Sequence, residues 1–294
     1  MYLSTSSNLN ISLLQVIQYR LATNPPPPEM SQILIENGRV KFTVEYEFEA
    51  TLIVLGDEPD MPWRLLNINI LVEDSETGEN GACSFNIIWL LNLLQSRIEN
   101  CDNPLPEVYT VLHKFSQLLQ LDVLYSQIWR LSLERLGGHV TCNYIKGRSL
   151  NVSYWKELAS RELKTDLGYR LTVEICEKRL QIFHNPPLAV KDSEQAILAP
   201  GNLSIENLLM QTIFARIRSR LLELKQKIQS KLGLQEINYL VEGSPATLHV
   251  SILSPCLDSE QLLVTVNPLT GNLQALMPQV LLFFFIFVSF FILL

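Results

Sequence analysis

The clearest pattern in the chain is an alternation of apolar and polar residues between positions 40 and 54. Even positions from Val40 to Val54 are apolar, whereas odd positions up to Thr51 are charged or polar. A period of two is typical of β-strands with one buried and one solvated face. Because fifteen residues are long for one strand, the pattern predicts a tight bend near Glu45–Glu47.

A third strand is predicted after an acidic turn. Residues 56–60, GDEPD, end the second strand, and Pro62 stiffens the return loop. Alternation then resumes, with apolar residues at Leu66, Ile68, Ile70 and Val72. The whole stretch is therefore predicted to be an antiparallel β-meander with its even positions buried.

Apolar residues recur at a helical spacing in four other segments. Residues 8–22 predict an opening helix that Pro25–Pro28 end. Residues 86–99 and 107–136 predict a long helical hairpin, in which the second helix shifts its apolar stripe and is expected to touch two surfaces. A long amphipathic helix is predicted from about Ser204, a good N-cap, to Gly233.

The remaining patterned segments predict β-structure. Two hairpins are expected within residues 139–155 and 169–184, and strands are expected at 246–253, at 261–266 and after the turn at 267–271. Strands and helices come in blocks without strict βαβ alternation, so the predicted fold class is α+β.

This pattern suggests four parts of the chain. Residues 1–28 are interpreted as the end of a helical region and a proline linker, and residues 29–187 as an α+β module. Residues 188–280 are interpreted as a second module or submodule, and residues 281–294 as an apolar, Phe-rich tail.

Composition narrows the class of protein. The net charge of −7 argues against a general nucleic-acid-binding protein, which needs a basic face. The five cysteines are scattered, without CxxC spacing, which is typical of reduced, mostly buried thiols in a cytosolic or nuclear protein. The first ten residues lack the features of a signal peptide.

No motif points to catalysis, a metal or a cofactor. The four histidines lie far apart, and none has a metal-ligand spacing. The chain contains no Walker motif, no GxGxxG and no GxSxG. The sequence therefore predicts that the protein is not an enzyme.

Two charged segments are candidate contact surfaces for a partner. Glu45, Glu47 and Glu49 share the outer face of the meander and are expected to be solvated. Residues 205–232 carry six basic and two acidic residues, a balance that suits an acidic or phosphate-bearing partner and equally a plain solvated helix face. The candidate partner-contact residues are Glu45, Glu47, Glu49, Asp57, Asp60, Trp63, Arg64, Arg216 and Arg220.

The last fourteen residues, LLFFFIFVSFFILL, contain no charge. As a helix they would span about 21 Å, less than the hydrocarbon core of about 30 Å. No Lys or Arg follows Lys231, so no basic anchor flanks the segment. A membrane tail anchor and a truncated or misread chain end are both open, and the abrupt change of composition after Val280 favours the second.

Several segments resemble the N-terminal part of the Mediator complex subunit 14 family. They are ENGRV (36–40), LGDEPDMPWRLLNINILVED (55–74), NLLQSRI (92–98), the helix around 118–136, GYRLTVEI (168–175) and VNPLTGN (266–272). The resemblance covers about residues 10–280, and its most specific segment is PWRLL.

The resemblance implies a nuclear, non-enzymatic scaffold without a cofactor. Such a subunit would bridge the head, middle and tail modules of Mediator and relay signals from activators to RNA polymerase II, without reading DNA sequence itself. Family members are much longer than this chain, and residues 281–294 have no counterpart in them. The leading hypothesis is a Mediator scaffold fragment, and the alternative is a tail-anchored membrane adaptor that uses residues 281–294.

Overall fold

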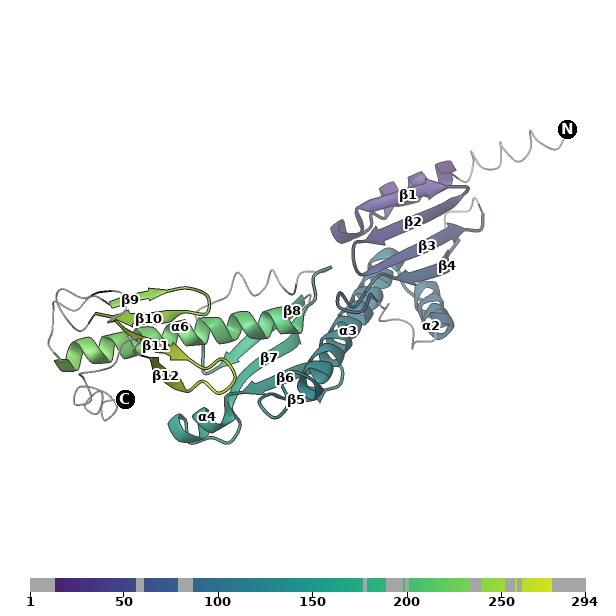
Figure 1. Cartoon of the computed structure of the whole chain (residues 1–294). Helices are drawn as coiled ribbons and strands as arrows, with labels where there is room; N and C mark the ends of the chain where they lie inside the picture. The colour runs from purple at the N-terminus through teal and green to yellow at the C-terminus, as the bar shows by residue number, and fades with distance from the viewer. Residues whose placement is uncertain are drawn as a thin grey trace.

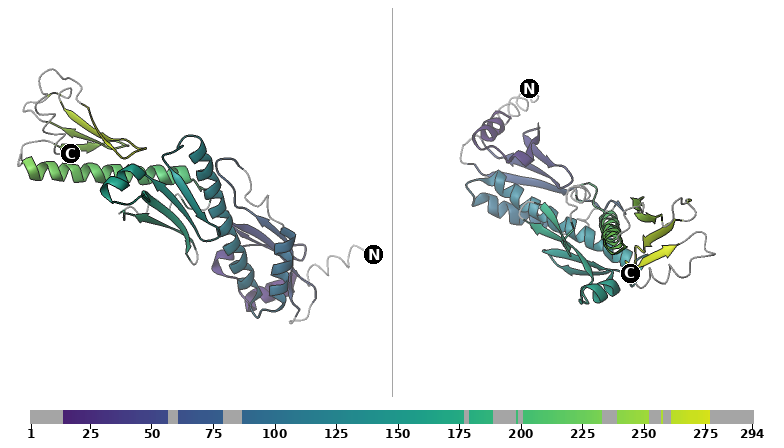
Figure 2. Two further views of the ribbon diagram at one scale, coloured as in Figure 1. Left: turned by 90° about the horizontal axis from the view of Figure 1, so that it is seen from below. Right: turned by 90° about the vertical axis from the view of Figure 1, so that its left-hand side faces the viewer.

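A computed structural model of the chain describes residues 14–56, 61–78, 87–176, 179–188, 201–232, 239–251 and 261–276, together with Leu198 and Leu257. These residues form three four-stranded antiparallel sheets with helices packed against them. Figures 1 and 2 show the three sheets one after another along an elongated molecule. The predicted α+β class is confirmed.

The first sheet contains β1 (Gln32–Glu36), β2 (Arg39–Val44), β3 (Phe48–Val54) and β4 (Trp63–Ile70), paired in that order. The predicted bend is confirmed as the turn between β2 and β3. Strand β1 was not predicted, although its signal is present: Asn37–Gly38 joins it to β2 with φ values of 51° and 71°. Asn-Gly with two positive φ angles is the preferred two-residue hairpin turn.

A β-bulge in this sheet breaks the simple alternation. Leu66 was predicted on the buried face, and this prediction is wrong, because Leu66 is exposed whereas Leu65 is buried. Thr51 lies opposite Asn67, but the next residue, Leu52, lies opposite Leu65. Leu66 is thus the extra residue of a bulge, which reverses the inward and outward positions on one side of it.

Helical segments cover the buried face of the first sheet. Residues 14–23 form a helix whose Ile17 joins the buried cluster of the sheet; positions 8–13 of the predicted helix lie outside the described residues. A short 3-10 helix, η1 (Pro28–Met30), precedes β1. The helix predicted at 86–99 is confirmed as α2 (Ile87–Glu99).

Helix α3 (Pro104–Leu133) belongs to two parts of the molecule. It begins three residues before the predicted position 107, because prolines fit the first turn of a helix, where their missing N–H has no partner to lose. It ends at Leu133 rather than at 136. Leu112 and Leu119 are buried in one cluster, and Leu124 and Ile128, closer to the end of the helix, are buried in another. The expected contact with two surfaces is therefore confirmed.

The second sheet contains β5 (Thr141–Ile145), β6 (Ser149–Tyr154), β7 (Tyr169–Cys176) and β8 (Arg179–Asn185). These strands are the two predicted hairpins. A short helix between β6 and β7, α4 (Lys156–Glu162), was not predicted.

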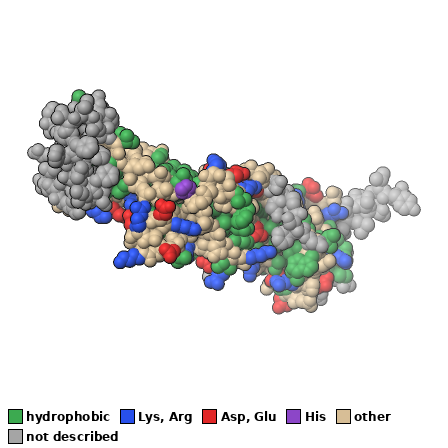
Figure 3. Space-filling view, turned by 60° about the horizontal axis from the view of Figure 1, so that its bottom comes forward, with side chains coloured by type: hydrophobic (Ala, Val, Ile, Leu, Met, Phe, Trp, Pro, Cys, Tyr) green, Lys and Arg blue, Asp and Glu red, His purple; other side chains and the backbone are tan. Residues whose placement is uncertain are grey.

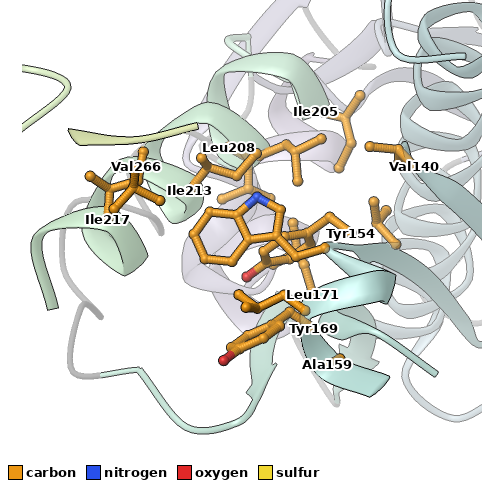
Figure 4. Packing of buried hydrophobic residues seen from close by; sticks show 14 of the residues in the cluster. Val140, Tyr154, Ala159, Tyr169, Leu171, Ile205, Leu208, Ile213, Ile217 and Val266 are labelled. Carbon is orange, nitrogen blue, oxygen red and sulfur yellow. The ribbon is translucent and has the colours of Figure 1, made fainter. Parts of the chain in front are cut away.

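The third part pairs helix α6 (Ile205–Leu232) with β9 (Tyr239–Glu242), β10 (Thr247–Val250), β11 (Leu262–Val266) and β12 (Leu273–Leu276). The expected N-cap is present, because Ser204 Oγ accepts a hydrogen bond of 3.3 Å from the Asn207 amide. The predicted apolar stripe of the helix is buried, and β9 was not predicted. Figure 4 shows Ile217 of α6 beside Val266 of the third sheet. Ile213 of α6 lies in the same cluster as Tyr154 and Leu171 of the second sheet.

The buried core divides within α3 rather than near residue 187. One hydrophobic cluster extends from Ile17 to Val123, and the other extends from Leu121 to Val266. The second cluster includes side chains from the second sheet, α6 and the third sheet. Side chains from residues 29–187 and from residues 188–280 therefore meet in this one cluster.

Candidate functional site

The outer face of the first sheet keeps two of the three predicted glutamates accessible. Glu45 is exposed and accepts a hydrogen bond of 2.5 Å from Gln32. Glu49 lies 2.6 Å from Lys41 and accepts a bond of 3.3 Å from Asn69. The hydrogen bond from Lys41 lowers the pKa of the Glu49 carboxyl, so this half-exposed group stays charged at neutral pH.

Glu47 does not belong to this face, and its predicted solvation is wrong. Its side chain is buried, and its Oε2 lies 2.6 Å from His113 Nδ1 on α3. Tyr46, at the centre of the turn, has φ of 60° and is 52% exposed. The turn interrupts the alternation of apolar and polar positions. Tyr46 therefore points to solvent, whereas Glu47 points to α3.

Other side chains of α3 enclose the Glu47–His113 pair. The His113 ring stacks on Tyr109 at 5.1 Å between centroids, and its Nε2 lies 3.1 Å from Gln117. Burial, followed by the charges of Glu29 and Glu47, raises the pKa of Tyr109 to about 12. The pair therefore fixes the β2–β3 turn on the helix and is not a contact surface.

The other candidate contact residues of the meander also include both buried and exposed side chains. Trp63 is buried, and the Arg20 guanidinium lies over its ring at 5.9 Å from the centroid. Arg64, the next residue, is exposed. Asp57 and Asp60 lie outside the described residues. Of the meander residues singled out, Glu45, Glu49 and Arg64 face solvent.

Arg216, predicted on a basic surface, lies inside the molecule. Its Nε donates to the Tyr154 hydroxyl at 3.2 Å, and its other nitrogens donate to the carbonyls of Pro186 and Pro187. Its guanidinium also lies 5.2 Å from the centre of the Tyr169 ring. These contacts hold α6 against the end of β8, which removes Arg216 from the candidate surface.

Arg220, one turn further along α6, is mostly covered and paired. It lies 2.7 Å from Glu162 on α4, and Glu162 also accepts a bond of 3.2 Å from Tyr169. Burial alone would raise the pKa of Glu162, but the hydrogen bond and charge of Arg220 outweigh it and lower the pKa. The two predicted arginines therefore attach α6 to the second sheet.

A polar network joins Asp74, in the segment that follows β4, to α3 and to the start of α6. Gln127 on α3 is fully buried, and its amide nitrogen donates to Asp74 at 2.6 Å and to the Leu203 carbonyl at 3.0 Å. Its amide oxygen accepts a bond of 3.0 Å from the backbone N–H of Ile205. Arg130 lies 2.7 Å from Asp74. We call these five residues the first joint.

The charge of Asp74 is maintained in this joint. Burial would raise the pKa of its carboxyl, but hydrogen bonds from Gln127, Arg130 and the following turn outweigh burial and lower the pKa. No motif marks Gln127, because it is one of four polar side chains buried on α3, together with Ser116, Gln117 and Gln120.

A close-packed turn joins the third sheet to the second. The indole N–H of Trp155 donates to the Pro268 carbonyl at 2.7 Å, and Arg161 donates to the Asn272 amide oxygen at 2.6 Å. A Cβ at Gly271 would lie 2.6 Å from the Trp155 ring and 2.7 Å from Leu158. Only glycine fits this approach, and φ of 74° favours it further. We call these residues the second joint.

A cavity of about 200 Å³ lies between the end of α3, the start of α6 and the β11–β12 turn. The Arg135–Glu206 ion pair, 2.9 Å long, lies at its edge. Its lining is mostly apolar and suits an apolar side chain, although His139 and Tyr154 also contribute to it; the apolar residues include Leu131, Leu136, Val140, Leu209, Ile213 and Pro268.

The described residues contain no cluster of His, Cys, Asp and Glu that could hold a metal ion. Three cysteines can be placed: Cys101 is exposed, Cys142 and Cys176 are half-buried, and all three are free thiols. The expectation of mostly buried thiols is therefore wrong for these three. No helix in this part of the chain is long and apolar enough to cross a membrane; residues 281–294 lie outside it.

Three family models match the chain. They are the Mediator complex subunit MED14 model at residues 4–56, the RM2 model of Mediator of RNA polymerase II transcription subunit 14 at 132–200, and the Med14 RM domain model, RM3, at 206–283. Proteins named Mediator of RNA polymerase II transcription subunit 14 match almost the whole chain. Identity is 43% over 276 residues in Anopheles gambiae, 41% over 275 in Homo sapiens and 31% over 279 in Caenorhabditis elegans.

The chain belongs to the Mediator subunit 14 family. The matched parts cover 91%, 90% and 88% of this chain in those three comparisons, but only 17%, 19% and 18% of the relatives. The chain therefore spans less than a fifth of their length. Within the Mediator subunit 14 family, the RM2 match contains the second sheet and the RM3 match contains α6 with the third sheet. The second joint thus connects two family domains.

Proposed function

We propose that this chain is a non-enzymatic scaffold subunit of the Mediator complex and acts in the nucleus. Its role is to hold other Mediator subunits, from the head, middle and tail modules, at fixed positions. Through them it would bridge activators and RNA polymerase II without reading DNA sequence itself. The observation that carries the proposal is the pair of joints, which fasten three sheet-and-helix parts to one another.

The joints suit a scaffold because they oppose movement between the parts. The first joint buries a fully hydrogen-bonded amide, and breaking it would leave buried polar groups without partners. In the second joint a glycine lies directly on an indole ring, with no room for displacement. Subunits bound at the first and third sheets would therefore keep their separation.

The accessible surfaces are also those of an assembly subunit. Large apolar side chains are exposed on all three parts, including Leu34, Trp129 and Leu276. Figure 3 shows hydrophobic side chains gathered in patches between charged ones on the face that it presents. Such patches are typical of surfaces that bind other proteins.

Co-purification tests the proposal. An affinity-tagged form of the chain is expressed in cells and recovered from a nuclear extract. The expected result is that Mediator subunits from more than one module are recovered with it. A matched chain with Gln127→Leu and Gly271→Ala, which loosens both joints, should recover fewer. Recovery of a folded wild-type chain without any Mediator subunit would overturn the proposal.

A further inference from the structure

The outer side of α3 carries an apolar row that packs against the core at Tyr125 and is exposed at its other two residues. Tyr125, Trp129 and Leu133 follow one another at intervals of four residues, so they lie on one face of the helix. Trp129 is 50% exposed and Leu133 is 67% exposed. The row extends about 12 Å along the helix. We call these three residues, with Tyr144 of β5, the aromatic stripe.

Ring contacts connect the three aromatic residues of the stripe. Tyr125 stacks on Tyr144 with centroids 4.6 Å apart and planes 19° apart, and it contacts Trp129 at 6.2 Å. The Tyr144 hydroxyl donates to Asp122 on α3. Burial and this hydrogen bond raise the pKa of Tyr144 to about 12, so the hydroxyl remains a donor. A preformed aromatic surface loses little side-chain entropy when a partner binds.

Two serine hydroxyls beside the stripe already have hydrogen-bond partners. Ser126 Oγ donates to the Val123 carbonyl at 2.8 Å, and Ser132 Oγ donates to the Trp129 carbonyl at 2.8 Å. A partner that covers these hydroxyls therefore breaks no bond to the protein. The desolvation cost of covering this face is low.

Charge distinguishes one end of the stripe from the other. Leu118 lies on the same helix face beside the β5–β6 turn, where its side chain is 3.5 Å from the Cβ position of Gly147. This turn carries Lys146, and α3 carries Lys114 one turn before Leu118; both lysines are exposed. The carboxylates nearby are engaged, because Asp122 accepts from Tyr144, and Glu174 lies 3.6 Å from Arg148. The two lysines therefore present positive charge to a partner.

We propose that the aromatic stripe binds an amphipathic helix of another Mediator subunit. This inference rests on the proposed scaffold function and specifies its partner. The bound helix would place apolar side chains, four residues apart, against Tyr125, Trp129 and Leu133. It would carry Asp or Glu at the end that lies next to Lys114 and Lys146, where opposite charges set its direction.

Crosslinking within the assembled complex tests the contact directly. A photoreactive phenylalanine analogue replaces Trp129 in the full chain, which is co-expressed with recombinant head- and middle-module subunits. Leu222 on α6, 41% exposed, is the matched control position. The expected result is a crosslink from position 129, absent from position 222, to one helical segment with apolar residues four apart and acidic residues at one end.

Substitutions measure the contribution of the stripe to assembly. Trp129→Glu with Leu133→Glu should reduce the partner recovered with the chain about tenfold or more, as expected for loss of a central aromatic contact. Leu222→Glu should leave recovery unchanged. Lys114→Glu with Lys146→Glu should reduce it less and remove part of its salt dependence. Circular dichroism establishes that each variant is folded.

The outcomes separate the two proposals. Assembly of the wild-type chain with normal recovery of the Trp129→Glu, Leu133→Glu variant would overturn the stripe proposal and leave the scaffold function standing. A crosslink from position 129 to a second copy of this chain, or to a segment without acidic residues, would also overturn it. Failure of the folded wild-type chain to assemble at all would overturn both.

Discussion

The two joints hold neighbouring parts of the same molecule by different means. The first joint depends on hydrogen bonds of one buried amide and one buried carboxylate, at 2.6–3.0 Å. The second depends on a turn whose glycine lies directly on an indole ring, supported by hydrogen bonds from that indole and from Arg161. Hydrogen bonds between buried polar groups stabilise the first joint, whereas close packing stabilises the second.

This difference has consequences for how each joint fails. A buried polar network loses stability when one member is removed, because the other members lose their partners. A close-packed contact loses stability when atoms are added, because the surrounding core cannot move aside. The first joint should therefore be sensitive to deletion and to pH, and the second to added volume.

The largest effect is expected at Gly271. Gly271→Ala should destabilise the chain by about 2–5 kcal/mol, from the cost of a positive φ and from overpacking against Trp155. The control is Gly138→Ala, where φ is 76° but no atom lies within 4 Å of the added Cβ. It should cost about 1–2 kcal/mol. Urea unfolding measures both, and equal losses would show that packing adds nothing at the second joint.

A smaller loss is expected from Gln127→Leu. The apolar side chain fits the helix but leaves the buried N–H of Ile205 without its acceptor and weakens the hold on Asp74. We expect a loss of about 2–3 kcal/mol in the free energy of unfolding. Gln117→Leu is the matched control, since Gln117 is buried on the same helix and contacts His113. A loss at Gln127 no greater than at Gln117 would contradict the polar account of the first joint.

Acid should loosen the first joint before the second. The folded-state pKa of Asp74 is below its ordinary value of 3.8, so its contribution is complete above that pH and is lost as pH falls through the folded pKa. The effect should be smaller than that of Gln127→Leu, because a neutral carboxyl still accepts hydrogen bonds. Hydrogen exchange of the Ile205 amide, compared with the Gly271 amide, measures it. Equal acceleration of both amides would contradict the prediction.

The periodicity of apolar residues was sufficient to predict most helices and strands, but it did not predict the two joints. The spacing of apolar residues predicted β2, β3, α2 and α6, because each of these buries one face along its whole length. It placed Leu66 wrongly, since a bulge residue cannot be seen in one strand alone. Family resemblance predicted membership, which the comparisons bear out.

Burial of charged residues was the main error, and its cause is long-range pairing. Glu47 is buried by His113, which is 66 residues away, and Arg216 is buried by Tyr154, which is 62 residues away. Such distant partners cannot be predicted from the residues next to Glu47 or Arg216 in the sequence. Glu49, by contrast, pairs across one hairpin with Lys41, and its outward position followed from the alternation.

The smallest effect is expected at the edge of the second joint. Arg161 donates to Asn272 at 2.6 Å, but Arg161 is exposed and Asn272 is half-buried, so this bond lies at the surface. Arg161→Met should therefore cost about 0.5 kcal/mol or less. In the first joint Arg130→Met removes a partner of the buried Asp74 and should cost about 1–3 kcal/mol. Urea unfolding of the two variants compares one arginine from each joint. If Arg161→Met proved as costly as Arg130→Met, hydrogen bonding would carry both joints, and the contrast between them would fail.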